Sequence, residues 1–289
     1  MNRKLFVAAC ILPAMILLIV LALAPTIGAI NLSFQDRSLR FPDGIYIGFE
    51  NYQRLLHDRR FLGALKTSVI WEIATVAGTM IGAAGVATLL YEKTRGQGRN
   101  LICLVLLLPI LLPRVSAGLI WRFMLSPSMG LINYPLTGMG LPPVDFLANP
   151  SLALWAVAFV DIWQWAPFFA VILLKLMETL PKSPLEAARI DHAKPWEIHW
   201  FVVLPMLRGP LIMLGFVKAV ESLRSFDLIY TMTNGGPGTS TETLDLYAYN
   251  QGIGISGETS YAAAMSVLLM VLTIVVFSII WNRMRQWSD

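Results

Sequence analysis

Polar side chains interrupt an otherwise apolar chain at a few places, and the first of these could bind a solute. The stretch Asp161-Ile162-Trp163-Gln164-Trp165 brings a carboxylate, an amide and two indoles together within about one and a half turns of helix. Aromatic faces stack on the C–H surfaces of sugars, while carboxylates and amides bond to hydroxyls. We therefore expect Asp161, Trp163, Gln164 and Trp165 to be candidates for a solute pathway. The alternative is that the tryptophans form an interfacial belt or pack helices together.

Further ionisable residues lie within apolar segments. Glu221, Arg224 and Asp227 follow one another at intervals of three, which would place them on one face of a helix. Such residues point toward a water-filled cavity or a partner helix, so they are also pathway candidates; pairing between Glu221 and Arg224 is the alternative. Arg114 follows Pro113, and within a membrane it would cost about 2.5–3.5 kcal/mol. It should therefore snorkel, pair with an acid or contact the solute.

The residues give little support for catalysis. The histidines are His57, His192 and His199, and they form no H-E-x-x-H pattern. The chain also lacks a G-x-S-x-G nucleophile elbow and a G-x-x-x-x-G-K-[ST] phosphate loop. We expect no catalytic residue, no metal site and no ATP hydrolysis by this chain.

The longest polar interval on the side of the membrane that we expect to be cytoplasmic runs from Ser183 to Pro210 and reads as a loop presented to another molecule. Ser183 could cap a helix, Pro184 suits its first position, and Glu186 would complete a capping box. This helix should run to about Ala193, because Lys194 precedes a proline and is pushed out of the helical conformation. A second helix can begin at Pro195. Two alanines beside Glu186 make a slim surface that could enter a groove on another protein.

This loop carries a resemblance to a known family. Glu186-Ala187-Ala188, then Asp191, then Leu204-Pro205 resemble the EAA loop of binding-protein-dependent ABC importer permeases, in particular the carbohydrate-uptake permeases of the maltose and glycerol-phosphate type. The family has a glycine after the aspartate where this chain has His192, which puts the tightness of that turn in doubt. The resemblance implies that coupling to an ATPase uses Glu186, Ala187, Ala188, Asp191, His192 and Ala193.

Other stretches extend the resemblance. Gly48-Phe49-Glu50-Asn51-Tyr52 is similar to the G-x-x-N-Y segment that precedes the second span of the family, and Phe226-Asp227 matches an F-D pair of the sugar permeases. The segment from Thr233 to Thr243 resembles the T-x-G-G-P…T-E-T signature of the maltose-type first permease subunit. Its turn, Asn234-Gly235-Gly236-Pro237, is expected to face outside, where a solute-binding protein would dock.

The composition is that of an integral membrane protein. Of 289 residues, 56% are hydrophobic and 14% are charged, against roughly 25% charged in soluble domains; the mean hydropathy is +0.63. We expect one transmembrane domain over residues 1–289, with six spans at about 5–30, 67–90, 101–124, 152–174, 207–232 and 260–281. The first could instead be a signal peptide cleaved after Ala24, but its apolar run exceeds the typical ~7–15 residues and Pro25 follows the site.

Basic residues set the expected orientation. With the N-terminus inside, the inner segments hold roughly twice as many Lys and Arg residues as the outer loops, whose basic residues all lie in the first of them. Both termini and the EAA loop should therefore be cytoplasmic. The net charge of +4 is modest and reads as an orientation signal rather than a nucleic-acid footprint.

Small residues predict close packing. Gly78-x-x-x-Gly82 is the pattern that lets helices approach closely in lipid, within this chain or with a partner permease. Cys10 and Cys103 both lie in apolar segments and are expected to be packing residues rather than a disulfide.

The resemblance implies an all-α transmembrane, six-helix type I importer permease in a bacterial cytoplasmic (inner) membrane. Its partners would be a second, different permease chain, two ATPase subunits that bind ATP and Mg²⁺, and an external solute-binding protein. No cofactor is expected in this chain. The solute could be a sugar, a sugar alcohol, an oligosaccharide or a glycerol-phosphate compound. The alternative is an ion- or proton-coupled secondary carrier, for which paired broken helices in internal repeats would be expected but are not evident in the sequence.

Overall fold

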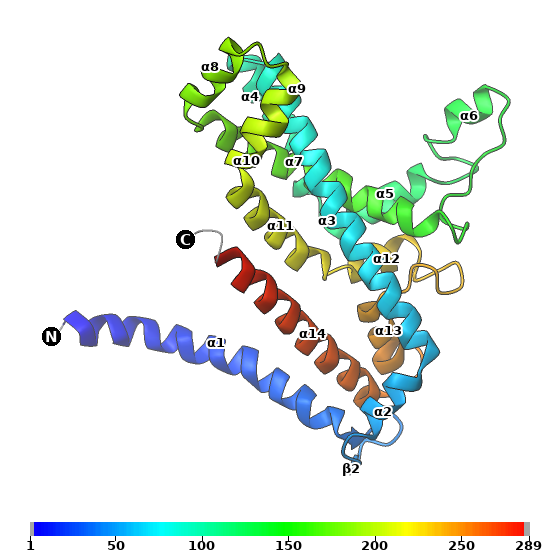
Figure 1. Ribbon diagram of the computed structural model, residues 1–289. Coiled ribbons are helices and arrows are strands. Elements are labelled where there is room, and N and C mark those ends of the chain that lie inside the picture. Colours follow the sequence, from blue (N-terminus) through cyan, green and yellow to red (C-terminus); the bar gives the residue numbers. More distant parts are fainter. Residues whose placement is uncertain (1–2, 286–289) are drawn as a thin grey trace. The chain divides into compact units, whose positions relative to one another are not determined.

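The computed structural model describes residues 3–285, which form two compact units (Figure 1). Of the described residues, one unit holds 3–62 together with Leu244–Ser278, and the other holds Gly63–Thr243 and 279–285. The first two and last four residues lie outside the described residues. The prediction that both termini are cytoplasmic concerns these residues and stays a prediction. A single transmembrane domain over residues 1–289 stays a prediction.

The first unit is built on two long apolar helices. Its elements are α1 (Arg3–Ser33), the strands β1 (Gln35–Asp36) and β2 (Ile45–Tyr46), α2 (Glu50–His57), α13 (Leu244–Tyr249), the π-helical turn η3 (Asn250–Gly254) and most of α14 (Thr259–Arg285). The strands pair antiparallel, with Gln35 opposite Tyr46.

The second unit holds the remaining helices. They are α3 (Arg59–Lys93), α4 (Gly96–Leu106), the 3₁₀ turn η1 (Pro109–Leu111), α5 (Arg114–Met124), α6 (Tyr134–Gly138), α7 (Ala153–Glu178), α8 (Lys182–Ile190), α9 (Pro195–Ile198), the π-helical turn η2 (His199–Val203), α10 (Leu204–Met206), α11 (Arg208–Ser222) and α12 (Phe226–Met232). In Figure 1, α8, α9 and α10 lie at the same end of this unit as α4.

Within residues 3–285, four helices are long and apolar enough to cross a membrane, or up to six segments if each of two bent pairs is one span. These four helices are Cys10–Ser33, Arg59–Lys93, Ala153–Glu178 and Thr259–Asn282, and they overlap the predicted first, second, fourth and sixth spans.

The regions of the predicted third and fifth spans are pairs of helices joined at a sharp bend. The third is bent by 96° between α4 and α5, where Pro109 and Pro113 cannot donate the backbone hydrogen bonds that a straight helix needs. The fifth region is bent by 74° just before Arg208 and is interrupted again between α11 and α12. Hydropathy gives the position of these spans, but it does not report their breaks.

The small-residue pattern of α3 is a packing seam within the chain. A methyl group on Gly78 would collide with the Ile162 side chain of α7, and one on Gly82 would lie 3.3 Å from the Ala166 Cβ. The glycines therefore let α3 and α7 approach closely, as predicted.

A buried apolar cluster joins the helices at one end of the second unit. It brings together side chains of α3, α4 and α7, including Cys103 and Phe169, with Leu185 of α8 and Val203 of η2. Cys103 is thus a packing residue as expected, whereas Cys10 is exposed; both are free thiols. The polar loop is fastened to the spans by this cluster.

The end of α1 is tied to α2 by the predicted G-x-x-N-Y segment. The Asn51 side-chain amide donates to the backbone carbonyls of Ser33 and Gln35, at 2.9 Å each. The hydroxyls of Ser33 and Tyr52 are hydrogen-bonded at 2.7 Å. Gly48 adopts φ +62°, in the left-handed region that favours glycine. The side chains of Asn51 and Tyr52 therefore fix the connection after the first predicted span.

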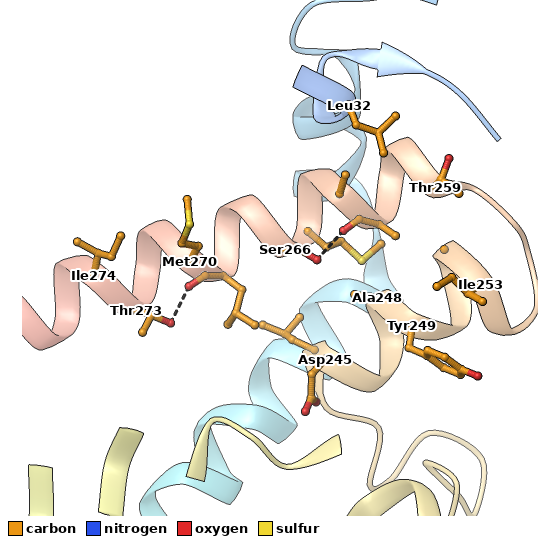
Figure 2. A pocket seen from close by; sticks show the side chains of 16 residues that line it. Leu32, Asp245, Ala248, Tyr249, Ile253, Thr259, Ser266, Met270, Thr273 and Ile274 are labelled. Carbon is orange, nitrogen blue, oxygen red and sulfur yellow. Dashed lines mark hydrogen bonds between the residues drawn. The ribbon is translucent and has the colours of Figure 1, made fainter. Parts of the chain in front are cut away.

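An apolar groove of about 720 Å³ runs along α13 and α14 (Figure 2). Its polar side chains include Ser266 and Thr273, whose hydroxyls donate to carbonyls of their own helix at 3.0 and 2.7 Å. Because these hydroxyls are satisfied locally, the groove presents a mainly apolar surface. None of the predicted solute-pathway residues lines it.

A carboxylate joins three segments of the first unit. Asp58 Oδ2 accepts hydrogen bonds from the hydroxyls of Tyr247 (2.6 Å) and Tyr261 (2.7 Å). Its Oδ1 accepts from the backbone N–H groups of Arg60 and Phe61, at 2.8 and 3.2 Å. Burial alone would raise the pKa of Asp58, but these four donors together outweigh it and hold the pKa below its usual value.

We expect Asp58→Asn to lower the free energy of unfolding by about 1–3 kcal/mol, because two tyrosine hydroxyls lose a charged acceptor. A lowered folded-state pKa means that the carboxylate contributes fully above its unfolded pKa and loses that contribution as the pH falls through the folded value. The thermal unfolding midpoint of the wild type should therefore drop more steeply than that of Asp58→Asn below about pH 4. Asp43→Asn, at an exposed carboxylate of the same unit, is the control. Parallel pH profiles for wild type and Asp58→Asn would contradict a stabilising role of the Asp58 carboxylate.

Candidate functional site

The loop that resembles the EAA motif folds into a short helix, but its start differs from the prediction. Helix α8 begins at Lys182 with Pro181 as the preceding cap residue, and no side chain caps it. The predicted capping box of Ser183 and Glu186 is therefore wrong. Pro181 is extended, with φ −61° and ψ 135°, so the chain enters the helix two residues earlier than a Ser183 cap would allow.

The helix also ends earlier than Ala193. Its last residue is Ile190, and the Ala193 N–H donates to the Ala188 carbonyl at 3.0 Å while the His192 N–H donates to the Arg189 carbonyl at 3.1 Å. This pair of bonds is the Schellman motif, which needs a left-handed residue at the position of His192. His192 has φ +56°, and histidine is among the residues enriched there. His192, which stands where the family has glycine, therefore keeps this turn tight.

Helix α8 presents one side to solvent and anchors the other. Leu185 is 6% exposed and belongs to the buried apolar cluster, whereas Glu186, Ala187 and Ile190 are exposed. The predicted slim surface is therefore accessible to another protein. Its use in coupling, with Glu186, Ala187, Ala188, Asp191, His192 and Ala193, stays a prediction.

A buried ion cluster occupies the middle of the second unit. Asp161 Oδ2 lies 2.6 Å from Lys218 Nζ, with both side chains fully buried, and Asp161 Oδ1 pairs with Arg114. Lys218 Nζ also donates to the Ser222 hydroxyl at 2.8 Å, which bonds to the Thr75 hydroxyl at 2.8 Å. The cluster thus connects α3, α5, α7 and α11.

The sequence did not single out Lys218 as a site residue, although a lysine in an apolar span demands a partner. The signal was the presence of Asp161 in a neighbouring span, but only the fold shows that the two meet. Arg114 pairs with an acid, which is one of the outcomes that its cost in a membrane predicts.

The other residues of the predicted Asp161–Trp165 segment have separate surroundings. Trp163 packs edge-on against Trp121 of α5, with ring centroids 5.2 Å apart. The Gln164 amide donates to the Leu112 carbonyl at 2.7 Å. The Trp165 ring lies 5.5 Å from Lys218 Nζ. Trp163 and Gln164 therefore have clear packing roles, and a solute contact for any of the four stays a prediction.

Glu221, Arg224 and Asp227 do not share one helix face, contrary to the prediction. The break between α11 and α12 falls after Ser222, so the interval of three does not keep a helical register. Glu221 and Arg224 approach to 3.9 Å, with the Arg224 side chain 77% exposed, so the alternative of local pairing has the better support. Asp227 is exposed at the start of α12.

The turn after α12 is held from within by its threonines. The Thr241 hydroxyl donates to the Gly236 carbonyl at 2.9 Å and is bonded to the Thr233 hydroxyl at 2.7 Å. Asn234 and Gly235 have φ +49° and +85°, and Pro237 follows a cis peptide bond. Thr241, Glu242 and Thr243 are buried, so this part of the signature has a structural role, while Asn234 is exposed.

Within residues 3–285, no group of three or more His, Cys, Asp and Glu side chains is arranged to hold a metal ion. The geometry of the second unit is that of a membrane scaffold with an accessible helix at one end and a charged cluster inside.

Comparisons with known proteins identify the class. Residues 74–289 match the family described as binding-protein-dependent transport system inner membrane component, and the chain belongs to this family. The trehalose/maltose transport system permease protein MalF of Thermococcus litoralis is 30% identical over 277 residues, covering 96% of this chain and 92% of the relative. The sn-glycerol-3-phosphate transport system permease protein UgpA of Agrobacterium fabrum is 31% identical over 230 residues, covering 79% and 77%.

A solved structure shares the fold. A chain of a bacterial ABC transporter involved in the import of the acidic polysaccharide alginate superposes with a TM-score of 0.87 at 21% identity, covering 100% of this chain and 98% of that one. The predicted family, the all-α type I importer permease fold and a multi-pass membrane location are thereby confirmed. The chain is a permease component of a binding-protein-dependent importer.

We expect loss of Asp161 to destabilise the protein more than loss of Lys218. Asp161→Leu leaves Lys218 and Arg114 without their anion and should lower the free energy of unfolding by about 3–5 kcal/mol. Lys218→Met leaves Asp161 paired with Arg114, so its loss should be clearly smaller, and the double variant should recover part of the Asp161→Leu loss. Thermal unfolding of the detergent-purified protein measures all three, with exposed Asp227→Leu as control. Equal losses in the two single variants would contradict this order.

Proposed function

We propose that this chain is the first permease subunit of an ATP-driven importer of a carbohydrate-type solute in a bacterial cytoplasmic membrane. It pairs with a second, different permease chain, two ATPase subunits and an external solute-binding protein, and both of its termini are cytoplasmic. ATP and Mg²⁺ bind to the ATPase subunits, and this chain hydrolyses no ATP. The observation that carries the proposal is an exposed Glu186-Ala187 surface on a helix whose opposite side is fastened to the spans by Leu185.

The anchored helix supports a coupling mechanism. When ATP closes the ATPase dimer, α8 moves with the groove that holds it, and Leu185 transmits the displacement to the apolar cluster of α3 and α7. The spans then rock between inward-facing and outward-facing states, and hydrolysis resets them. Such coupling requires that the ATPase contacts differ between the two states, and the α8 surface supplies those contacts.

The solute class is supported by the names of the relatives, which transport trehalose and maltose or sn-glycerol-3-phosphate. On this chain, Trp163, Trp165, Glu221, Arg224 and Asp227 are the side chains with suitable chemistry that retain some exposure. Asp161 and Gln164 are buried and engaged in the scaffold, so they would act by positioning. The exposed Asn234, with Gly235, Gly236 and Pro237, would contact the solute-binding protein.

Enlarging the slim surface should uncouple the importer. We expect Ala187→Trp to lower solute uptake by about 5–150-fold, the range of a typical coupling free energy, while the assembled complex keeps ATPase activity. Ala187→Ser, which adds one oxygen atom, should retain uptake and serves as the size control. Uptake by cells and ATPase activity of the purified complex are the measurements; normal uptake in Ala187→Trp would refute the role of this surface.

The assembly itself is tested by purification from native membranes in mild detergent, with mass spectrometry of the proteins recovered. We expect an ATPase and a second permease, and ATP hydrolysis that rises when the solute-binding protein and its sugar are added. A chain recovered alone, without nucleotide hydrolysis, would overturn the proposed assembly and make ion- or proton-coupled flux the next experiment.

A further inference from the structure

A groove of the second unit carries mostly positive charge. This groove of about 550 Å³ lies between the end of α3 and the start of α4 on one side and the α8–η2 loop on the other. Its lining includes four cationic side chains, Lys93, Arg95, Arg99 and Arg189, but one carboxylate, Glu92. None of the solute-pathway candidates contributes to it, so it is separate from the proposed translocation route.

Most of this positive charge is not neutralised by ion pairs among the described residues. Arg99 is engaged, since it pairs with Glu178 at 2.6 Å and donates to the Tyr91 carbonyl at 3.2 Å. Lys93, Arg95 and Arg189 have no ion-pair partner among residues 3–285. The three side chains are exposed, so solvent screens their mutual repulsion in part, and an anion between them would lower it further.

A further donor lies in the same groove. Both ring nitrogens of His199 are buried without a hydrogen-bond partner, and the nearest anionic oxygen, Glu92 Oε1, is 3.6 Å from Nε2. Leaving a buried polar group unsatisfied costs about 1–3 kcal/mol, so an acceptor in the groove would be stabilising. The imidazole and the three free cations together favour a ligand with several anionic oxygens.

The groove also has an apolar part and sits at the end of a span. Leu185, Ile198 and Val203 line it beside the cations, and Lys93 is the last residue of the membrane-spanning α3. Leu185 and Val203 are already packed in the apolar cluster, whereas Tyr91 and Ile198 are half-buried and open to a ligand. A free phosphate ion would leave these two side chains uncovered, whereas a phospholipid has a phosphate for the cations and an acyl chain for Tyr91 and Ile198. Basic pockets between spans at the cytoplasmic surface bind anionic head groups.

We propose that this groove binds an anionic phospholipid, with the phosphate at Lys93, Arg95 and Arg189 and an acyl chain against Tyr91 and Ile198. Leu185 and Arg189 are four residues apart on one face of α8, whereas Ala187 lies on the opposite face. A lipid can therefore occupy the groove while an ATPase subunit holds the exposed surface. Through Arg189, the lipid would stabilise the position of the coupling helix.

The experiment is a lipid titration of the purified full chain, with the subunits that accompany it, followed by native mass spectrometry. Phosphatidylglycerol and phosphatidylcholine with identical acyl chains are the two probes. We expect Lys93→Ala/Arg95→Ala to lower the affinity for phosphatidylglycerol about thirtyfold, at roughly 1 kcal/mol for each basic residue, and to leave phosphatidylcholine binding unchanged. Lys182→Ala/Lys194→Ala removes the same charge from exposed positions outside the groove and should retain the affinity.

Three results would overturn the proposal. The first is equal affinity for the two lipids, and the second is an equal loss in the groove variant and its control. The third is tight binding of glycerol phosphate that competes with the lipid, because it would make the groove a site for free anions. Arg189→Gln provides an independent test if Lys93→Ala/Arg95→Ala lowers the unfolding midpoint. The proposed cytoplasmic side rests on the proposed function, but lipid binding in detergent does not depend on it, so either can fail without the other.

Discussion

The buried ion pair between Asp161 and Lys218 is the interaction on which the second unit most depends, because lipid offers no water to solvate either charge. Asp161 is the anion beside Lys218, and Arg114 is its second cationic partner, so the Lys218 charge depends on Asp161 and ties α11 to α7. Arg114 adds a third charge and also donates to the Arg224 carbonyl, next to the break between α11 and α12. Gln164 donates to the Leu112 carbonyl at the break before α5. Polar side chains of the cluster and of α7 thus satisfy the backbone groups that the broken spans leave open.

This arrangement explains why charges and helix breaks occur together in one apolar protein. A break exposes carbonyls that cost several kcal/mol each in hydrocarbon, and a buried side-chain donor removes that cost. Conversely, Arg114 can reach Asp161 because it begins a new helix after Pro113. Broken spans of this kind are also found in secondary carriers, but here they belong to a chain of the binding-protein-dependent family.

Much of the fold could be predicted because it depends on local properties. Length and hydropathy place the spans, and Gly78 and Gly82 predict the seam with α7. Periodicity does not encode contacts between distant segments. It therefore could not predict the helix breaks, the ion pair of Asp161 with Lys218, or the packing of Trp163 against Trp121 instead of beside Asp161. The capping box failed for a related reason: Pro181 and the anchoring of Leu185 set where α8 begins, and these tertiary constraints outweigh the local preference of Ser183. In the candidate site, the sequence located the exposed α8 surface but missed Lys218.

Helix α8 is too short to be stable alone, since isolated helices below roughly 12–15 residues are marginal in water. Its nine residues persist because Leu185 is buried in the cluster of α3 and α7 and because the Schellman bonds at His192 close its end. The conformation of α8 is therefore tied to the packing of the spans beneath it. A coupling element needs this property, because a helix stable by itself could move with an ATPase without displacing the spans. The same dependence explains why the groove beside Arg189 is well placed to influence coupling: any ligand that fixes this face of α8 acts on the junction between the loop and the spans.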